Sequence, residues 1–213
     1  MRSKTLRAGF AAFVLAVGAF ALMASHEARA ADTAKAFVET SIDKGSAILS
    51  DSSLDTGQRQ SQFRGFLLSI TDTRRVGLFT LGSYARGASE PDIAVFVTAF
   101  TDFVTALYQR SLDRSNGQTI RVTGSTEHSE DDTIVRADVL DPNGKSPPMK
   151  IGFRVRTNDS GNYVLTDLQV EGVWLAMSQL SDFTAYLQQH HGEIGQLSKE
   201  LEKRAVAMRA SRA

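Results

Sequence analysis

The sequence predicts an α+β domain in which a four-stranded antiparallel sheet carries helices on its apolar face. Apolar residues recur about every 3.6 positions through residues 32–112, which is the periodicity of amphipathic helices. Between residues 118 and 170 the period changes to two, the periodicity of strands with one buried face. Short turn sequences separate the four strand segments, and such short links favour an antiparallel meander.

Residues 1–30 have the organisation of a secretory signal peptide. Three basic residues precede seventeen apolar or glycine positions, residues 8–24, a run that is short for a stable membrane span. An Ala-Arg-Ala sequence then supplies small side chains for signal peptidase. The sequence therefore predicts export to the periplasm, cleavage between Ala30 and Ala31, and a single mature domain over residues 31–213.

The composition excludes several classes of function. Without residues 1–30 the chain has 20 Lys and Arg against 23 Asp and Glu, a formal net charge of −3. It therefore lacks the clustered positive charge that binding to nucleic acid requires. The chain contains no cysteine, which excludes disulfides, thiol nucleophiles and cysteine-ligated metal or iron–sulfur sites.

Three helices are expected in the first part of the mature chain. The first begins at Asp32 or Thr33 and ends before a polar segment, Ser52–Gly57. The second has apolar residues at i, i+3, i+4 and i+7. The third, a short one, is capped by Asp72 or Thr73 and ends at Gly82, since glycine tolerates the left-handed C-cap conformation. The apolar sides of these helices comprise Phe37, Val38, Ile42, Ile48, Leu49, Phe63, Phe66, Leu67, Ile70, Val76 and Phe79.

The clearest helix signal lies in residues 89–112. Ser89, Pro91 and Asp92 form an N-terminal capping sequence, because serine can cap and proline is tolerated in the first turn. A wide apolar stripe follows, consisting of Ile93, Phe96, Val97, Phe100, Phe103, Val104, Leu107 and Tyr108. A stripe of this width predicts that something sizeable packs against the helix.

The four predicted strands are Gln118–Thr123, Thr133–Leu140, Met149–Thr157 and Tyr163–Val170. Within them apolar residues alternate with charged ones, so one face of the sheet is expected to be apolar and the other wet. The helices must then cover the apolar face. Two helices are expected after Trp174, with Gly192 between them and a basic end on the last one.

No contiguous catalytic or metal-binding motif is present. The histidines of the mature segment, His128, His190 and His191, lack the i, i+4 spacing of a helical metal pair, and the glycine-rich nucleotide motifs are missing. We therefore expect no cofactor. Asp138 or Asp167 could serve as a general base if it were buried in an apolar pocket. The simpler interpretation is that both face solvent or cap a turn.

Two blocks of the sequence resemble the toluene-tolerance family, the periplasmic phospholipid-binding shuttle proteins of the Mla type. The blocks are Asp72–Arg86, followed by Phe96, Phe100 and Tyr108, and Asp167–Leu175, followed by Phe183 and Gly192. With a tryptophan at position 174, the sequence resembles the branch of the family that is associated with hopanoid biosynthesis.

The resemblance implies a lipid carrier and not an enzyme. It implies a four-stranded antiparallel sheet and a helical layer that enclose a lipid cavity, and a phospholipid or hopanoid-type cargo that is shuttled between inner and outer membrane. The implied partners are an inner-membrane lipid ABC transporter complex and an outer-membrane lipid-transport component. Combined with the apolar stripes, it predicts that the cavity is lined by Phe100, Phe103, Val104, Tyr108, Ile151, Phe153, Val155, Val173 and Trp174.

Two other functions stay open at this point: an envelope scaffold that uses its apolar surface for protein contacts, and a small acid/base enzyme with an apolar pocket. For the aromatic stripe, core packing is the alternative to a cavity, because a filled interior and a hollow one have the same periodicity. A co-purifying lipid would separate the carrier from the scaffold. Turnover that is lost on removing one acid would identify the enzyme.

Overall fold

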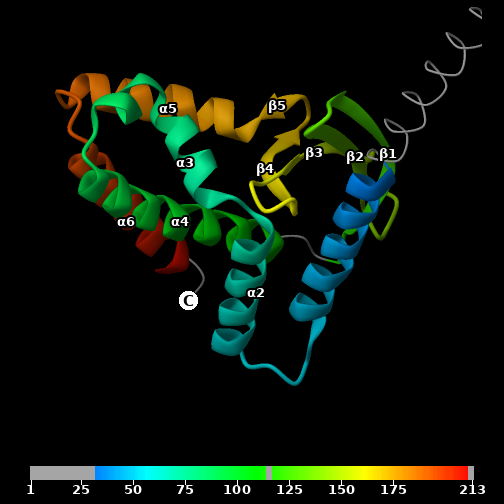
Figure 1. Cartoon of the computed structure of the whole chain (residues 1–213). Coiled ribbons are helices and arrows are strands. Elements are labelled where there is room, and N and C mark those ends of the chain that lie inside the picture. Colours follow the sequence, from blue (N-terminus) through cyan, green and yellow to red (C-terminus); the bar gives the residue numbers. More distant parts are fainter. Residues whose placement is uncertain (1–31, 114–116, 211–213) are drawn as a thin grey trace, which may run out of the picture.

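A computed structural model of the chain describes residues 32–113 and 117–210 (Figure 1). The predicted signal peptide and its cleavage site lie outside the described residues. Within them the chain has the expected α+β architecture, with helices followed by an antiparallel sheet and then further helices.

Several helices precede the sheet, and the second and third are capped by aspartates; the sequence predicted a cap at Asp72 or Thr73 but none at Asp55. The first is helical from residue 32 to residue 50 and is called helix 32–50 below. The carboxylate of Asp55 accepts from the N–H of Gln58 at the start of the second helix, and Asp72 accepts from the N–H of Arg75 at the start of the third. The later elements of this part are α2 (Thr56–Ile70), α3 (Thr73–Leu81), the 3₁₀ helix η1 (Gly82–Gly87) and α4 (Glu90–Asp113).

The sheet has five strands, not the four that were predicted. They are antiparallel neighbours in chain order: β1 (Thr119–Ser129), β2 (Asp132–Leu140), β3 (Met149–Thr157), β4 (Tyr163–Val170) and β5 (Val173–Trp174). The additional strand exists because Glu171 and Gly172 both have positive φ, 47° and 85°. Two successive residues with positive φ make a tight hairpin turn, which folds β5 back onto β4.

Strand β1 is also longer than predicted, since it continues to Ser129. The sequence between Glu127 and Asp132 reads as a turn, but its first residues still pair with β2. The register shifts twice along this pair, after Val122 and after Glu127. These shifts interrupt the period-two pattern, and for that reason the strand was predicted to be too short.

Helices α3 to α6 gather on one side of the molecule, beside strands β4 and β5 (Figure 1). The last two are α5 (Leu175–Gln189) and α6 (Ile194–Ala210). Their core is built around Phe183, which is 1% exposed and lies against Phe96, Phe100 and Phe103 of α4. The wide apolar stripe of α4 is therefore covered mainly by other helices.

Part of the apolar face of the sheet is covered by helix 32–50. Ala34 and Val38 of this helix are buried against Val135 and Val155 of the sheet. Another apolar cluster of the sheet, around Ile151, is formed by strand side chains in the described part of the chain. The sequence predicted that helices cover the apolar face without saying which, and at the cluster of Val135 and Val155 this helix is helix 32–50.

Helix α4 is also the one helix of the described residues that is long and apolar enough to cross a membrane, over Glu90–Arg110. A core helix passes the same test of length and composition. Since Phe96 and Phe100 are at most 2% exposed within the helical core, packing between helices accounts for this composition.

Candidate functional site

The predicted lining residues of α4 lie in the helical core. Phe100 and Phe103 are 2% and 6% exposed, and both rings stand roughly edge-on to Phe183 at centroid distances of 6.3 Å. Edge-to-face pairs at this separation are favourable aromatic contacts. Val104 is half-buried and packs against the same cluster. These side chains pack between helices, whereas the sequence predicted them as the lining of a cavity between the helical layer and the sheet.

The predicted residues of β3 form an apolar wall. Ile151, Phe153 and Val155 alternate along the strand and so share one face of the sheet. Ile151 and Val155 are buried, whereas Phe153 is half-buried and touches both apolar clusters of the sheet. The structure therefore brings these three residues together, but apart from the helical core.

Val173 and Trp174 leave β5 on opposite faces of the sheet. Val173 lies opposite Val170, and Trp174 lies opposite Gln169. Because neighbouring residues of a strand point to opposite sides, their side chains are not brought together. Val173 is 55% exposed, and Trp174 is half-buried at the start of α5.

Tyr108, the last predicted residue of α4, is half-buried. Burial, and after it the negative charge of Asp167, raises the pKa of the Tyr108 phenol to about 12. The phenol therefore stays neutral at physiological pH, and it gives no sign of acid or base chemistry.

Both aspartates that could have been a general base have structural partners. The Asp138 carboxylate is buried between two cations, at 2.8 Å from the Lys150 ammonium and 3.7 Å from the Arg121 guanidinium. The expectation that Asp138 faces solvent or caps a turn is therefore wrong. Asp167 accepts hydrogen bonds from the backbone N–H groups of Leu168 and Ala176, and so caps the start of α5. Burial is the main reason why the pKa of Asp167 is raised.

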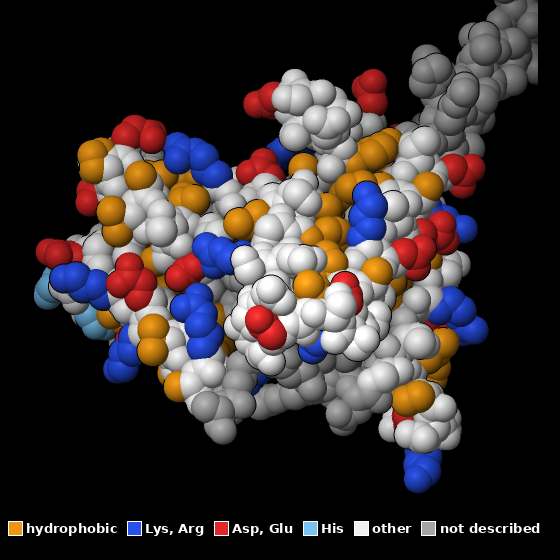
Figure 2. Space-filling view, turned by 90° about the horizontal axis from the view of Figure 1, so that it is seen from below, with side chains coloured by type: hydrophobic (Ala, Val, Ile, Leu, Met, Phe, Trp, Pro, Cys, Tyr) orange, Lys and Arg blue, Asp and Glu red, His pale blue; other side chains and the backbone are white. Residues whose placement is uncertain are grey.

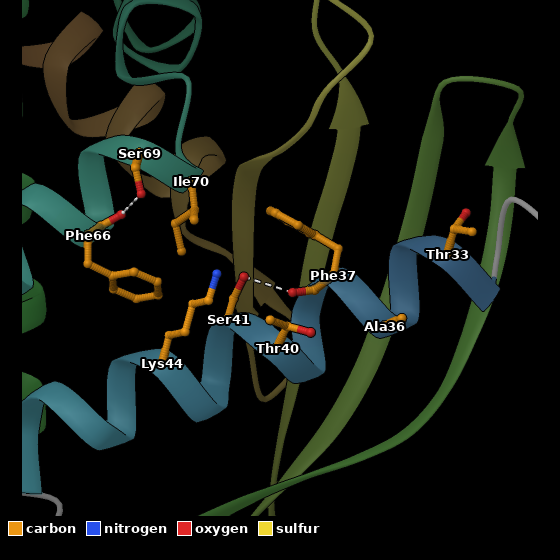
Figure 3. A pocket seen from close by; sticks show the side chains of 9 residues that line it. All are labelled: Thr33, Ala36, Phe37, Thr40, Ser41, Lys44, Phe66, Ser69 and Ile70. Carbon is orange, nitrogen blue, oxygen red and sulfur yellow. Dashed lines mark hydrogen bonds between the residues drawn. The ribbon is translucent and has the colours of Figure 1, made fainter.

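An apolar cleft lies between helix 32–50 and α2 (Figure 3). It is an open hollow of about 390 Å³, near the lower end of the range for small-molecule sites. Phe37, Phe66 and Ile70 supply its large apolar side chains, and Figure 3 shows them facing the hollow from the two helices. The remaining lining residues are Thr33, Ala36, Thr40, Ser41, Lys44 and Ser69.

The cleft closes where the two helices approach each other at Gly45. A Cβ at this position would lie 3.1 Å from the ring of Phe66 and 3.7 Å from that of Phe63. Glycine thus allows a close approach that a larger side chain would prevent.

Phe37 joins the cleft to the sheet. Its ring lies 5.9 Å from that of Tyr163, and its side chain packs on the cluster that contains Val135 and Val155. Seen from below, the middle of the molecule shows hydrophobic side chains interspersed with polar and charged groups (Figure 2). The apolar wall of the sheet and the cleft are therefore parts of one apolar region.

Sequence reasoning missed this cleft although it identified the residues that form its walls. Phe37, Phe66 and Ile70 were predicted as the buried sides of two helices. Helical periodicity marks an apolar side, but a gap between two apolar sides leaves no signal in either pattern.

A second open cleft, of about 620 Å³, lies between η1 and the turn from α5 to α6. It is more polar, and its walls include Tyr84, Asp92, His191 and Glu193. Neither this cleft nor any other place in the described ranges gathers three His, Asp or Glu side chains in an arrangement that could hold a metal ion.

Comparison with known proteins gives two consistent results. The family model described as "MlaC protein" matches residues 39–203. A solved structure of a phospholipid-binding protein from Ralstonia solanacearum, in complex with a phospholipid, has a similar fold, with a TM-score of 0.71 and 22% sequence identity. The similarity covers 82% of this chain and 98% of the other.

Proposed function

This chain belongs to the MlaC family, and we propose that it is a periplasmic lipid-binding carrier with a phospholipid as its cargo. The proposal rests on the apolar cleft between helix 32–50 and α2, together with the phospholipid that the structurally similar Ralstonia solanacearum protein binds. A carrier needs apolar walls and an accessible mouth, and it needs no catalytic group.

Lipid binding in this cleft is favourable for a simple reason. Transfer of an alkyl chain from water to an apolar site gains about 0.8 kcal/mol for each methylene buried. The rings of Phe37 and Phe66 offer apolar surface, and the cleft is open, so a headgroup can stay in water. We place the alkyl chain along these rings and toward Phe153 of the sheet.

The nine residues predicted from the sequence then have different roles in this proposal. Ile151, Phe153 and Val155 form the inner wall next to the cleft. Phe100 and Phe103 stabilise the helical layer. We assign no direct lipid contact to Val104, Tyr108, Val173 or Trp174.

We also propose that the carrier moves lipid between the two membranes of the envelope. Its partners would be an inner-membrane ABC transporter complex and an outer-membrane lipid-transport component. The finer assignment of a hopanoid-type cargo rests on the resemblance carried by Trp174. Trp174 pairs with Gln169, and its side chain lies on the opposite face of the sheet from that of Val173. For this reason we favour the phospholipid.

Blocking the cleft tests the proposal. Ala36 lines the cleft and is exposed, so Ala36→Trp places an indole where the alkyl chain is proposed to lie. We expect the variant to lose most of the lipid seen by native mass spectrometry, with little change in melting temperature. Ala47→Trp is the matched control, since Ala47 is exposed on the same helix and does not line the cleft. Equal lipid occupancy in both variants and the wild type would place the cargo elsewhere.

A further inference from the structure

We propose that the cleft selects lipids whose headgroup carries a net negative charge, and that the ammonium group of Lys44 recognises this charge. This inference rests on the proposed carrier function. It goes further because it names the class of headgroup and the residue that discriminates.

The first observation is the composition of the cleft wall. Of its nine residues only Lys44 is charged, and no carboxylate lines the hollow. Figure 3 shows the Lys44 side chain extending from helix 32–50 across the cleft, with its nitrogen pointing toward Phe66 and Ile70 of α2. A cation thus stands beside apolar walls, which is the pattern that suits an amphiphile with an anionic head.

The second observation is that Lys44 has no acidic partner among the residues that the structure describes. The ion pairs of these residues do not include it, although Lys35, nine positions earlier on the same helix, is paired with Glu39 at 3.7 Å. The charge of Lys44 is therefore not neutralised inside the protein and is available to a ligand.

Two of the four hydroxyl groups that line the cleft already donate to backbone carbonyl oxygens. Ser41 donates to the carbonyl oxygen of Phe37 at 2.7 Å, and Ser69 donates to that of Phe66 at 2.7 Å. Their protons are used within their own helices. An anionic oxygen in the cleft would consequently find its cationic donor in Lys44.

A zwitterionic headgroup is less suited to this site. Its phosphate could approach Lys44, but its ammonium group would find no carboxylate on the cleft wall. A headgroup with phosphate as its only charged group avoids that mismatch. Because Lys44 is exposed, we expect a moderate preference, about two- to fivefold, which corresponds to an exposed ion pair.

The test is competition between two lipids. Delipidated mature protein is incubated with vesicles that contain equal amounts of phosphatidylglycerol and phosphatidylethanolamine, and the lipids bound to the re-isolated protein are quantified by mass spectrometry. The wild type should be enriched in phosphatidylglycerol. In Lys44→Gln the ratio should fall about two- to fivefold, and in Lys44→Glu it should fall further, since an anion then faces the anionic head. Added salt should weaken the preference of the wild type.

Lys35→Gln is the control, because it removes the same charge from the same helix outside the cleft. It should keep the wild-type ratio, and this would show that net charge and attraction to the vesicle are not the cause. Bound lipid with the same headgroup ratio in the wild type and both Lys44 variants would overturn the role of Lys44 while leaving the carrier function intact. Absence of bound lipid from all variants and the wild type would overturn both.

Discussion

The carboxylate of Asp167 on β4 accepts a hydrogen bond of 2.9 Å from the backbone N–H of Ala176 in the first turn of α5. This contact joins the sheet to the helical layer and satisfies one of the free N–H groups at the start of a helix. The Asp167 carboxylate is also a half-buried charge. Burial raises the pKa of this carboxyl group despite two backbone hydrogen bonds and the charge of Arg154.

Asp167→Asn should be as stable as the wild type or more stable at neutral pH, because the amide oxygen can still accept from Ala176 without burying a charge. Asp167→Ala should lose about 1 kcal/mol, the usual value of an N-cap. Because the pKa of Asp167 is raised in the folded protein, the folded protein binds the proton at a higher pH than the unfolded chain does. The wild type should therefore gain stability relative to Asp167→Asn as the pH falls through the raised pKa toward the unfolded value near 3.9. Urea unfolding of the three proteins across this pH range measures the effect, and a parallel response of wild type and Asp167→Asn would contradict it.

Asp132 gives the opposite pH response. It is 1% exposed, and its carboxylate lies 2.9 Å from Nε of Arg154 and 2.7 Å from Nη2 of Arg156. Burial favours protonation, but the hydrogen bonds and charges of the two arginines outweigh it, so the pKa is lowered. Asp132→Asn should cost about 3 kcal/mol at pH 7, because two cations lose their shared partner. The difference in stability between the wild type and Asp132→Asn should vanish as the pH falls through the lowered pKa of Asp132.

Asp131→Asn serves as the control for this substitution. Asp131 is 56% exposed and lies 3.7 Å from the same Arg156. An exposed pair contributes little, about 0.5 kcal/mol. Chemical denaturation at pH 7 compares the two variants, and similar losses in both would mean that burial of Asp132 is not decisive.

Tyr108 should be the phenol that ionises near pH 12. The chain has four tyrosines, and burial followed by the charge of Asp167 raises the pKa of this one from 10.0 to about 12. An ultraviolet titration of the folded protein should show a late phenolate step that is missing from Tyr108→Phe and present in Tyr163→Phe. Since the folded state resists ionisation, the stability that Tyr108 contributes should be complete below about pH 10 and decline from there to about 12.

Phe183→Ala should destabilise the protein by about 3 to 5 kcal/mol, because the cavity forms where three phenylalanine rings of α4 meet. Phe79→Ala, at a side chain that is 47% exposed, should cost much less. Thermal unfolding of both variants provides the comparison. A small loss for Phe183→Ala would indicate that the helical core is loosely packed.

The mature protein should begin at Ala31. N-terminal sequencing or intact mass of exported protein measures this directly, and the basic n-region followed by residues 8–24 is the reason for the expectation. Material that keeps residues 1–30 and stays in the membrane fraction would refute it.

Much of the fold was determined by local sequence patterns. The helical stripe of α4, the alternation of β3 and the caps at Asp72 and Ser89 each depend on residues that lie close together in the chain. Period and capping chemistry act over a few residues, so the element and its apolar side can be predicted from the sequence. The class α+β and the antiparallel order of β1 to β4 followed from these patterns.

The tertiary structure decided which apolar sides meet. Phe100 packs against Phe183 and not against Phe153. The side chains of Val173 and Trp174 lie on opposite faces of the sheet, because a tight turn creates β5. Helix 32–50 packs on the sheet. Hydrophobic burial is favourable and non-directional, so an apolar stripe specifies that it will be covered but not by what. The cleft between Phe37 and Phe66 depends on the relative placement of two helices, and for this reason neither helix reveals it alone.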